Sequence, residues 1–489
     1  MIRNARRAFL LALLTVAVVP APAAEKITPV LTYEQALQVI IDTYPSLTIA
    51  ALQVEKARQE QIRVESSLSW VLEGDGSINR ELSLLGTPSE TASLGAGLQR
   101  RFASGNSLGL RGSYRYQDSE QVFGPTYPNP AHSTSLDLDY RMPLERGKDN
   151  PDYRQGLVSA EAQVLLEEAN RLAIREQLAR QTLELFYGLA TVRASYETAR
   201  AGVARARRLQ KYVQERYRLG LAEEKDRLQA EAQLRLQISQ MRKLEISWTQ
   251  MRTNLNRLMG RPWNQEYRPR LGAELQAEAL PEQALPSLLT EAEQHSPDLL
   301  RNQARERLGK AELQRRRDAR QDQLDLVVSV GTQTFMGPST YGDVDTRELV
   351  GGLRLEYQNA LDKRGFDAAI YQAQLDIRTA EEDSRRVRDD LRYRLSGLLG
   401  ELAAARKALI AYKARLKSEQ RKYDEALKLY REGRFTTDRL IQFENELQAA
   451  RFALEQQRIE YAQRQQDLAI LRGRIWQHLH LSKKEEGRP

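Results

Sequence analysis

The apolar positions of the chain predict two very long helices. Residues 150–218 and 364–431 carry a helical pattern with no proline beyond the first turn, and the patterns end just before Gly220 and Gly433. Glycine commonly follows the last turn of a helix because it adopts a left-handed backbone without steric cost. At 1.5 Å per residue, a helix of about 70 residues forms a rod about 100 Å long.

Shorter helical patterns accompany each long one. Residues 31–66 and 282–320 open the two halves of the chain, and a return segment follows each tip glycine. In the first return segment Leu234, Ile238 and Met241 are spaced four and three apart, as in a coiled-coil seam. A first helix of about 36 residues and a return helix of about 38 together match one long helix, so two short rods can stack end to end beside it. Because the apolar stripes are narrow, we expect these helices to assemble laterally.

Alternating apolar and polar positions predict strands before each long helix. The second half of the chain has two such segments around a loop at 337–342, and the first half has room for four. One apolar and one polar face suit the wall of a membrane barrel. The turn Ser104-Gly-Asn106 supports an added hairpin, and the sequence leaves open whether this hairpin joins the wall or folds at its rim. The four predicted segments are 70–84, 92–102, 107–117 and 134–144.

The same order of elements occurs in both halves of the chain, which indicates a duplication. Pro297 follows Pro45 by 252 residues and Gly433 follows Gly220 by 213, so the second copy is shorter by 39 residues. The missing residues fall in the β region. The predicted division is a signal peptide at 1–24, a first repeat at 25–281 with its β segment at 70–146, and a second repeat at 282–489 with its β segment at 324–358.

The first residues resemble a secretory signal. Arg3, Arg6 and Arg7 precede an apolar run at 8–19, and small residues follow at 21–24. Removing this segment takes away three positive charges, so the net charge of +8 falls to +5. A weakly basic balance of interspersed charges is typical of solvated helix faces rather than of nucleic-acid binding.

Composition limits how the chain could meet a membrane. Beyond the predicted signal, no stretch approaches the roughly eighteen apolar residues that a spanning helix needs. Any membrane crossing must therefore use strands. Cysteine is absent, so the thiol that carries a lipid anchor is missing as well.

The order helix, β segment, long helix and return helix, repeated after a signal peptide, resembles the TolC-like outer membrane efflux family over essentially the whole mature chain. The residues that carry the resemblance are the Leu-Thr-x-x-x-Ala-Leu opening at 31–37, Pro45 and Pro297, Pro143-Leu-Glu-Arg-Gly147, Gly220 and Gly433, and Leu-x-x-Leu-Met-Gly at 255–260.

The resemblance implies an α+β membrane protein. Three copies would share one outer-membrane β-barrel, continued by a long periplasmic α-helical coiled-coil barrel and built from two tandem structural repeats. The chain would be the exit duct of a tripartite efflux or type I secretion system, passing substrates outward without catalysis. The implied partners are a homotrimer, a periplasmic adaptor, an inner-membrane pump or ABC exporter, and outer-membrane lipid, with no nucleic acid. The alternative is a soluble periplasmic coiled-coil scaffold or adaptor without a membrane barrel, although such a scaffold has no need of the alternating strands.

Related channels carry aspartates that narrow the entrance at the inner tip. By the resemblance, Asp438 falls at the first such position and Asp226 is its equivalent in the first tip, whereas Ile441 stands where a second aspartate is expected. Three carboxylates rather than six would then ring the aperture. A helix N-terminal carboxylate, stabilised by the helix dipole, is the alternative interpretation of both aspartates. The residues expected to contact an adaptor are Arg218, Leu219, Gly220, Arg431, Gly433, Arg434 and Phe435. The alternative interpretation is an exposed helix turn that contacts no partner.

The sequence offers little for catalysis or metal binding. It has four histidines, no cysteine, and neither a nucleophile elbow nor a phosphate-binding loop. The pair His478 and His480 lies in a polar tail, where such pairs are usually solvated. We therefore predict no enzyme activity, no cofactor and no metal site.

Overall fold

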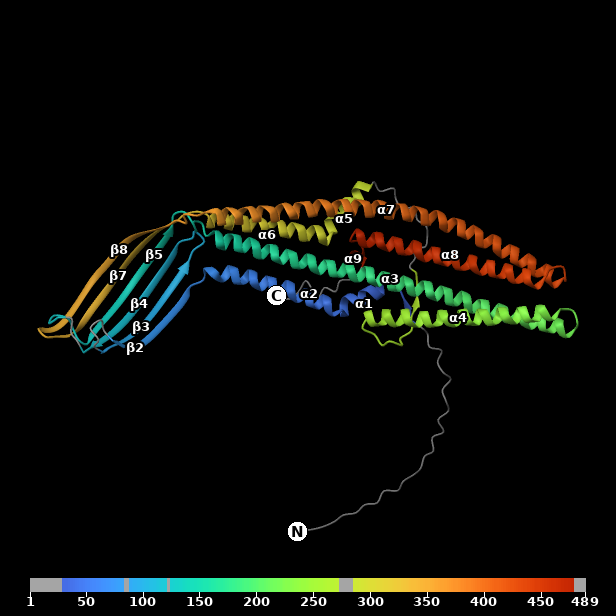
Figure 1. The fold of residues 1–489 in the computed structure, drawn as a ribbon, viewed down its shortest axis with the longest axis horizontal. Coiled ribbons are helices and arrows are strands. Elements are labelled where there is room, and N and C mark those ends of the chain that lie inside the picture. The colour runs from blue at the N-terminus through green and yellow to red at the C-terminus, as the bar shows by residue number, and fades with distance from the viewer. Residues whose placement is uncertain (1–28, 83–87, 121–123, 272–284, 479–489) are drawn as a thin grey trace, which may run out of the picture.

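The computed structural model describes residues 29–82, 88–120, 124–271 and 285–478. The predicted signal peptide lies outside these residues. Long helices run through most of the molecule, and a six-stranded sheet forms one end (Figure 1). None of the helices in this described part is long and apolar enough to cross a lipid bilayer.

Two helices span the whole helical part. The helices α3 (Pro151–Arg218) and α7 (Arg364–Arg431) have 68 residues each, which confirms the predicted long helices to within a residue. The start of α3 is fixed locally, because the Asn150 side chain accepts a hydrogen bond from the Tyr153 amide at 3.3 Å. Pro151 occupies the first turn, where its missing amide hydrogen costs nothing.

The shorter helices lie end to end beside the long ones, as predicted. Helices α2 (Pro45–Glu65) and α4 (Glu224–Leu258) both pack along α3, and α6 (Pro297–Ala319) and α8 (Thr437–Leu471) pack along α7. Across the molecule the order is therefore α2, α3, α6, α7 near the sheet and α4, α3, α8, α7 near the other end.

The opening helical patterns are each broken in two. Helices α1 (Tyr33–Thr43) and α5 (Leu285–His295) stop before Pro45 and Pro297, because proline lacks an amide hydrogen and its ring clashes with the preceding turn. The Thr32 hydroxyl and the Gln35 side chain form a capping box at the start of α1. The helical pattern predicted over 31–66 thus forms two helices that meet at Tyr44.

Six of the strands in the described residues form one antiparallel sheet, in the order β2-β3-β4-β5-β7-β8. The four segments predicted in the first half are thus all strands of the same sheet. The predicted loop at 337–342 is mostly strand instead, because the β7–β8 hairpin turns only at Thr340 and Tyr341. The strands are β2 (Val71–Leu82), β3 (Pro88–Arg101), β4 (Ser107–Ser119), β5 (Ala131–Pro143), β7 (Gln323–Ser339) and β8 (Gly342–Gln358).

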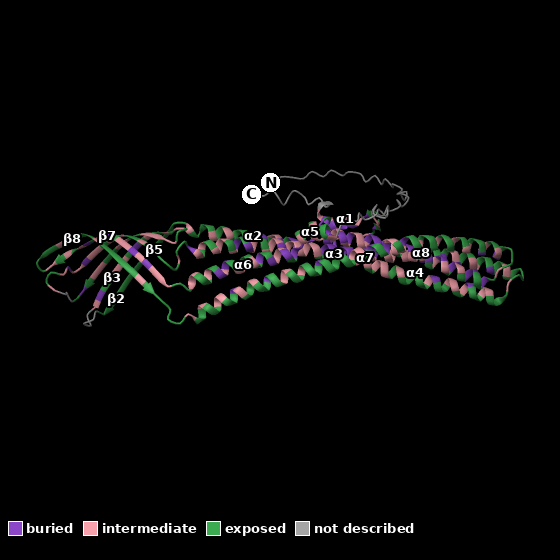
Figure 2. Cartoon of the chain, turned by 90° about the horizontal axis from the view of Figure 1, so that it is seen from above, coloured by how far each residue is buried: buried purple, intermediate pink, exposed green. Residues whose placement is uncertain are grey.

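The main core lies halfway along the helices (Figure 2). Tyr33, Phe186 and Tyr187 are buried and pack ring against ring, and the Tyr33 hydroxyl donates to the Ala179 carbonyl at 3.0 Å. Beside this core β1 (Val30–Leu31) pairs in parallel with β6 (Arg268–Pro269), a two-residue pairing that the sequence did not predict. The remaining elements are η1 (Ser66–Leu68) and α9 (Ile475–His478).

Candidate functional site

The end of the molecule far from the sheet consists of two helical hairpin tips, one from α3 to α4 and one from α7 to α8 (Figure 1). Gly220 and Gly433 have φ angles of 69° and 76°, a conformation that favours glycine. The following amides, of Leu221 and Arg434, bond back to the carbonyls of Arg216 and Leu429 at 2.8 and 2.9 Å. These bonds are those of a Schellman motif, so the predicted helix ends at both glycines are confirmed.

The first tip uses Asp226 as a helix cap. The Glu223 amide donates to Asp226 Oδ2 at 3.1 Å, and the Glu223 side chain accepts from the Asp226 amide in return. A hydrogen bond to Glu223 and the charge of that carboxylate raise the pKa of the neighbouring Lys225, and the charges of Asp226 and Asp438 add smaller effects. The ion-pair partner of Lys225 is Glu223, with 2.7 Å between Nζ and Oε2.

The second tip holds Asp438 in its first helical turn. A hydrogen bond from the Thr436 hydroxyl lowers the pKa of Asp438, and the amides of Asp438 and Arg439 add to this effect. The carboxylate is exposed to solvent and remains ionised at neutral pH. Both aspartates thus act as helix N-terminal groups, and this local role is compatible with a charged aperture.

Aromatic contacts tie the two tips together. Tyr430 of α7 is buried, packs with a tilted ring against Tyr212 of α3 at a centroid distance of 5.6 Å, and shares a 3.0 Å hydrogen bond with the Thr437 hydroxyl. The Arg216 guanidinium lies over both rings, and its Nη2 donates to the Leu221 carbonyl at 3.2 Å. The sequence reasoning missed this cluster, because no local pattern links α3 with α7.

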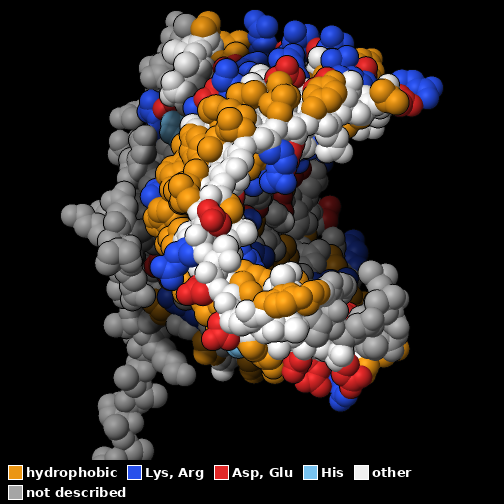
Figure 3. All heavy atoms as spheres, turned by 90° about the vertical axis from the view of Figure 1, so that its left-hand side faces the viewer, with side chains coloured by type: hydrophobic (Ala, Val, Ile, Leu, Met, Phe, Trp, Pro, Cys, Tyr) orange, Lys and Arg blue, Asp and Glu red, His pale blue; other side chains and the backbone are white. Residues whose placement is uncertain are grey.

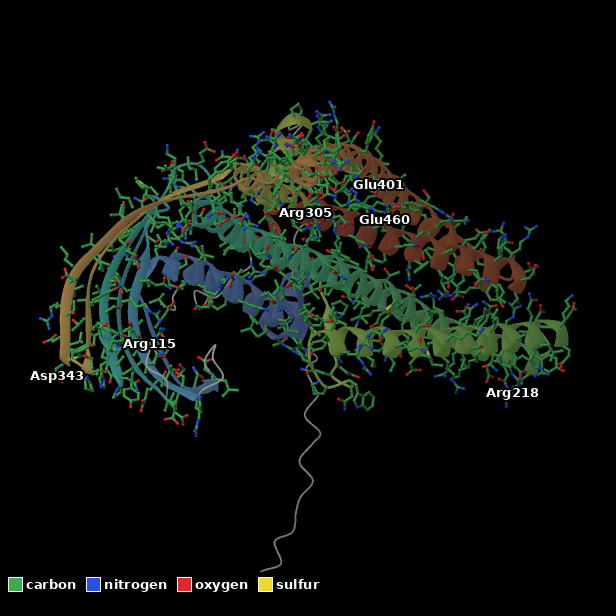
Figure 4. The ribbon with its side chains drawn as sticks, turned by 60° about the vertical axis from the view of Figure 1, so that its left-hand side comes forward. Arg115, Arg218, Arg305, Asp343, Glu401 and Glu460 are labelled. Atoms are coloured by element: carbon green, nitrogen blue, oxygen red, sulfur yellow. The ribbon has the colours of Figure 1, made fainter. Side chains whose placement is uncertain are left out.

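The predicted adaptor-contact residues differ in exposure. Leu219 is 72 % exposed at the turn, and Arg218 is exposed beside Glu215, its ion-pair partner at 3.3 Å (Figure 4). Arg431 and Arg434 are also exposed. Phe435 is less exposed than these residues. It is half-buried because its ring packs against that of Phe443, with 5.6 Å between the ring centroids.

The sheet at the opposite end has one apolar and one polar face. The register aligns Leu72, Leu98, Leu110, Leu138 and Val330 in one row across five strands, all on the same face. Each of these five side chains is exposed in the single chain. An exposed apolar band of this extent marks contact with lipid or with another protein.

The other face of the sheet carries bridged charges. Arg111 of β4 pairs with Asp75 of β2 at 2.5 Å, and Arg141 of β5 pairs with Asp325 of β7 at 2.8 Å and with Glu356 of β8. Seen end-on, the sheet curves as an open arc (Figure 3). A polar concave face and an apolar outer face are what a water-filled barrel in lipid requires.

The described residues contain no group of three or more side chains that could hold a metal ion. His480 of the polar tail lies outside the described residues.

Comparison with known proteins identifies similar folds. The family model "Outer membrane efflux protein" matches residues 98–261. VceC of Vibrio cholerae, an outer membrane protein, is 15% identical with a TM-score of 0.64, covering 90% of this chain and 96% of its own. The outer-membrane channel OprN is 16% identical with a TM-score of 0.66, covering 90% and 89%. The MtrE outer membrane channel of Neisseria gonorrhoeae, in its open state, is 18% identical with a TM-score of 0.60, covering 90% and 88%.

At these identities the similarity establishes the fold, which is the predicted combination of sheet and long helices. No curated protein sequence matches the chain. The closed barrel, the three copies and the duplication stay predictions.

Proposed function

We propose that this chain belongs to the outer membrane efflux protein family and is the outer-membrane channel of an efflux or type I secretion system. It would conduct substrates passively from the periplasm to the exterior. The observation that carries this proposal is the two-faced sheet: an apolar row on one side, bridged charges on the other, and long helices continuing from its base. The sheet would cross the outer membrane and the helices would extend into the periplasm.

Assembly of three copies would cover the two open flanks of the chain. One flank is α7, and the other consists of α2 and α4. Tyr371, Leu375 and Tyr393 are exposed, and at about 100° per residue they lie on the face of α7 opposite its buried side. Exposed apolar side chains on a helix face without an intrachain partner indicate an intermolecular contact.

The two flanks match in height. Leu375 lies 11 residues after the start of α7 at Arg364, and Leu52 lies 13 residues before the end of α2 at Glu65, so both are about 15–20 Å from the sheet end of the helices. Near the other end, Ile410 precedes Arg431 by 21 residues and Ile246 follows Glu224 by 22, which is about 32 Å from the tips in both cases.

The α7 flank of one copy would contact the α2 and α4 flank of the next copy, which is a heterologous interface. Such interfaces close into a ring when the rotation between neighbouring copies divides a full turn evenly. Three copies in a ring would enclose a bore along the helices and the polar face of the sheet. Substrates would enter it from the tips.

The tips would contact the partner proteins. Arg218, Leu219, Arg431 and Arg434 are exposed at the turns and accessible to a periplasmic adaptor. The adaptor would connect the tips to an inner-membrane pump or ABC exporter. Asp438 and Asp226 would set the charge of the aperture at the same level.

We further propose that the chain consists of a signal peptide at 1–24 and two repeats, 25–281 and 282–489. The equal lengths of α3 and α7, and of α4 and α8 at 35 residues each, support a duplication. The chemistry is that of a conduit, and the proposal includes no catalytic residue and no cofactor.

The test is membrane fractionation of the mature protein, with gel electrophoresis of heated and unheated samples and a mass determination in detergent. A heat-modifiable trimer in the outer-membrane fraction is the expected result. A soluble monomer or dimer in the periplasm would instead favour the coiled-coil scaffold.

A further inference from the structure

The β3–β4 hairpin has no counterpart in the second half of the sheet. There, β7 follows α6, β8 leads into α7, and the two strands pair directly. In the first half, β2 follows α2 and β5 leads into α3, but β3 and β4 lie between them. We propose that this hairpin is a full-height part of the membrane wall, and that three copies close edge to edge, β8 against β2 of the next copy, into an eighteen-stranded barrel. This inference rests on the proposed function.

The apolar face supports the hairpin as wall. Leu98 of β3 and Leu110 of β4 lie in the same row as Leu72 of β2 and Leu138 of β5. All four side chains are exposed in the single chain. A hairpin folded away at the rim would break this row, whereas a hairpin in the wall continues the apolar band without interruption.

An ion pair on the polar face connects the hairpin to the neighbouring strand β2. Asp75 of β2 and Arg111 of β4 pair across β3, at the position of Gly95. A Cβ atom on residue 95 would lie 2.7 Å from Asp75 Oδ1 and 3.0 Å from Arg111 Nη2, so a larger residue there would require the two side chains to shift. The ion pair therefore joins β2 to β4, the second strand of the inserted hairpin, across β3.

The sheet edges identify what completes the wall. Within the described residues β2 and β8 each pair on one side only, and they expose edges of 12 and 17 residues. Open edges of this length are not tolerated in lipid, where every backbone polar group needs a partner. Since β2 leaves the helical part and β8 returns to it, β8 of one copy and β2 of the next run antiparallel and continue the pattern of the sheet. The occupant of each edge is thus a second copy of this chain.

The width of the wall also fits the helices. Six strands about 4.8 Å apart and tilted by about 40° cover an arc of about 38 Å, and four strands would cover about 25 Å. Each copy supplies four helices at the junction, α2, α3, α6 and α7, which at 8–10 Å each cover about 32–40 Å. An eighteen-stranded wall therefore continues the helical tube without a neck at the junction.

Cysteine pairs test the closure, because the chain has no cysteine of its own. Ser77→Cys in β2 would be combined in turn with Thr346→Cys, Glu348→Cys and Val350→Cys, which lie on the same face of β8. We expect one of these pairs to form disulfide-linked dimers and trimers on a non-reducing gel. The Ser113→Cys and Ser135→Cys pair is the control for a link within one chain, because these two hydroxyls lie 2.9 Å apart.

Three results would overturn the closure. A β2–β8 link within one chain would mean that the sheet closes on itself. A link within one chain between Ser77→Cys and Ser133→Cys would mean that β2 meets β5 directly and that the hairpin lies outside the wall. Absence of any β2–β8 link in protein that is trimeric would also contradict the proposed edge pairing.

Deleting residues 88–119 tests the width. The deletion would place β2 directly beside β5, in the way that β7 lies beside β8 in the second half. A cysteine introduced on the polar face by Ser329→Cys then reports which sizes of thiol-reactive polymer reach the lumen from outside. We expect the deletion variant to form a trimer in the outer membrane with a narrower lumen, so that its size limit for polymers is lower than that of the full-length chain. An unchanged size limit would refute the inserted wall while leaving the proposed function intact, and a full-length chain found outside the outer membrane would refute both.

Discussion

Arg205 of α3 and Glu444 of α8 form an ion pair between the two halves of the chain, with 2.9 Å between Nε and Oε1. Their side chains are only 13% and 9% exposed. Burial raises the pKa of Glu444 even though Arg205 is its partner. The pair lies beside Gly202, where a Cβ atom would come within 3.0 Å of the amides of Gln237 and Gln448, so α3, α4 and α8 approach closely here.

Removal of the cation should destabilise the helical part in a pH-dependent way. Arg205→Met leaves Glu444 buried without its partner, and such a loss costs about 3 kcal/mol. Because the folded-state pKa of Glu444 lies above its unfolded value, the stability contributed by protonation is present at low pH and is lost as the pH rises through the folded-state pKa. The midpoint temperature of thermal unfolding of Arg205→Met should therefore lie further below that of the unsubstituted protein at pH 8 than at pH 5.

The double variant Arg205→Met with Glu444→Leu is the matched control for this prediction. Replacing both charges with apolar groups of similar size is often neutral. The double variant should recover most of the lost stability at pH 8 and show little pH dependence. Equal destabilisation by the single variant at both pH values would contradict the buried-carboxylate account.

Two glycines of the second hairpin should respond to alanine with opposite signs. Gly433 has a φ of 76°, so Gly433→Ala should destabilise the tip by about 1 kcal/mol through backbone strain alone. Gly397 lies inside α7 with open space around it, so Gly397→Ala should stabilise the helix by about 0.5–1 kcal/mol. Thermal unfolding of both variants measures the difference, and a shift of the same sign in both would rule out this explanation.

Removal of the exposed carboxylate at the second tip should change conduction rather than folding. Asp438→Asn removes one charge per copy from the aperture, and we expect a severalfold loss of cation preference in planar bilayers. Since hydrogen bonds lower the pKa of Asp438, the wild-type preference should persist as the pH falls from 7 to 5 and disappear only at more acidic pH.

Asp226→Asn provides the comparison at the first tip. Asp226 is half-buried and engaged in a capping box, so this change should lower thermal stability more than it alters ion preference. The proposed aperture would be wrong if Asp438→Asn left the cation preference unchanged.

Charges introduced on the flanks should control assembly. Leu375→Asp places a charge on the exposed apolar face of α7 and should convert trimers to monomers in detergent. Combining it with Leu52→Lys should restore part of the trimer, because the two residues lie at similar heights on opposite flanks. Leu221→Asp, on the exposed tip, is the control and should leave the mass unchanged. Loss of trimer with Leu221→Asp, or none with Leu375→Asp, would argue against this interface.

The sequence predicted the elements better than their contacts. The long helices and their ends at Gly220 and Gly433 follow from local rules, namely an unbroken helical pattern and a left-handed glycine, and both are confirmed. The stacking of short helices beside long ones followed from lengths alone. The predicted loop at 337–342 is too long. Gly337 and Pro338 are typical of a break in a strand, yet both residues pair within the β7–β8 hairpin.

Contacts between distant segments were beyond local patterns. The pairing of Val30 with Arg268, the Arg205–Glu444 pair and the Arg216–Tyr430 contact each join residues more than 200 positions apart. The register of the sheet decided the position of the inserted hairpin, since strand alternation at 92–117 suits a wall and a rim equally. The partners depend on other molecules, so they are proposed rather than shown.

The most direct test of the account is electron microscopy of the mature protein in lipid nanodiscs. We predict three copies around one continuous bore, with the sheet inside the lipid disc and the tips of Gly220 and Gly433 projecting away from it. A single chain without a bore, or a sheet located outside the lipid, would contradict the central claim that this chain forms an outer-membrane channel.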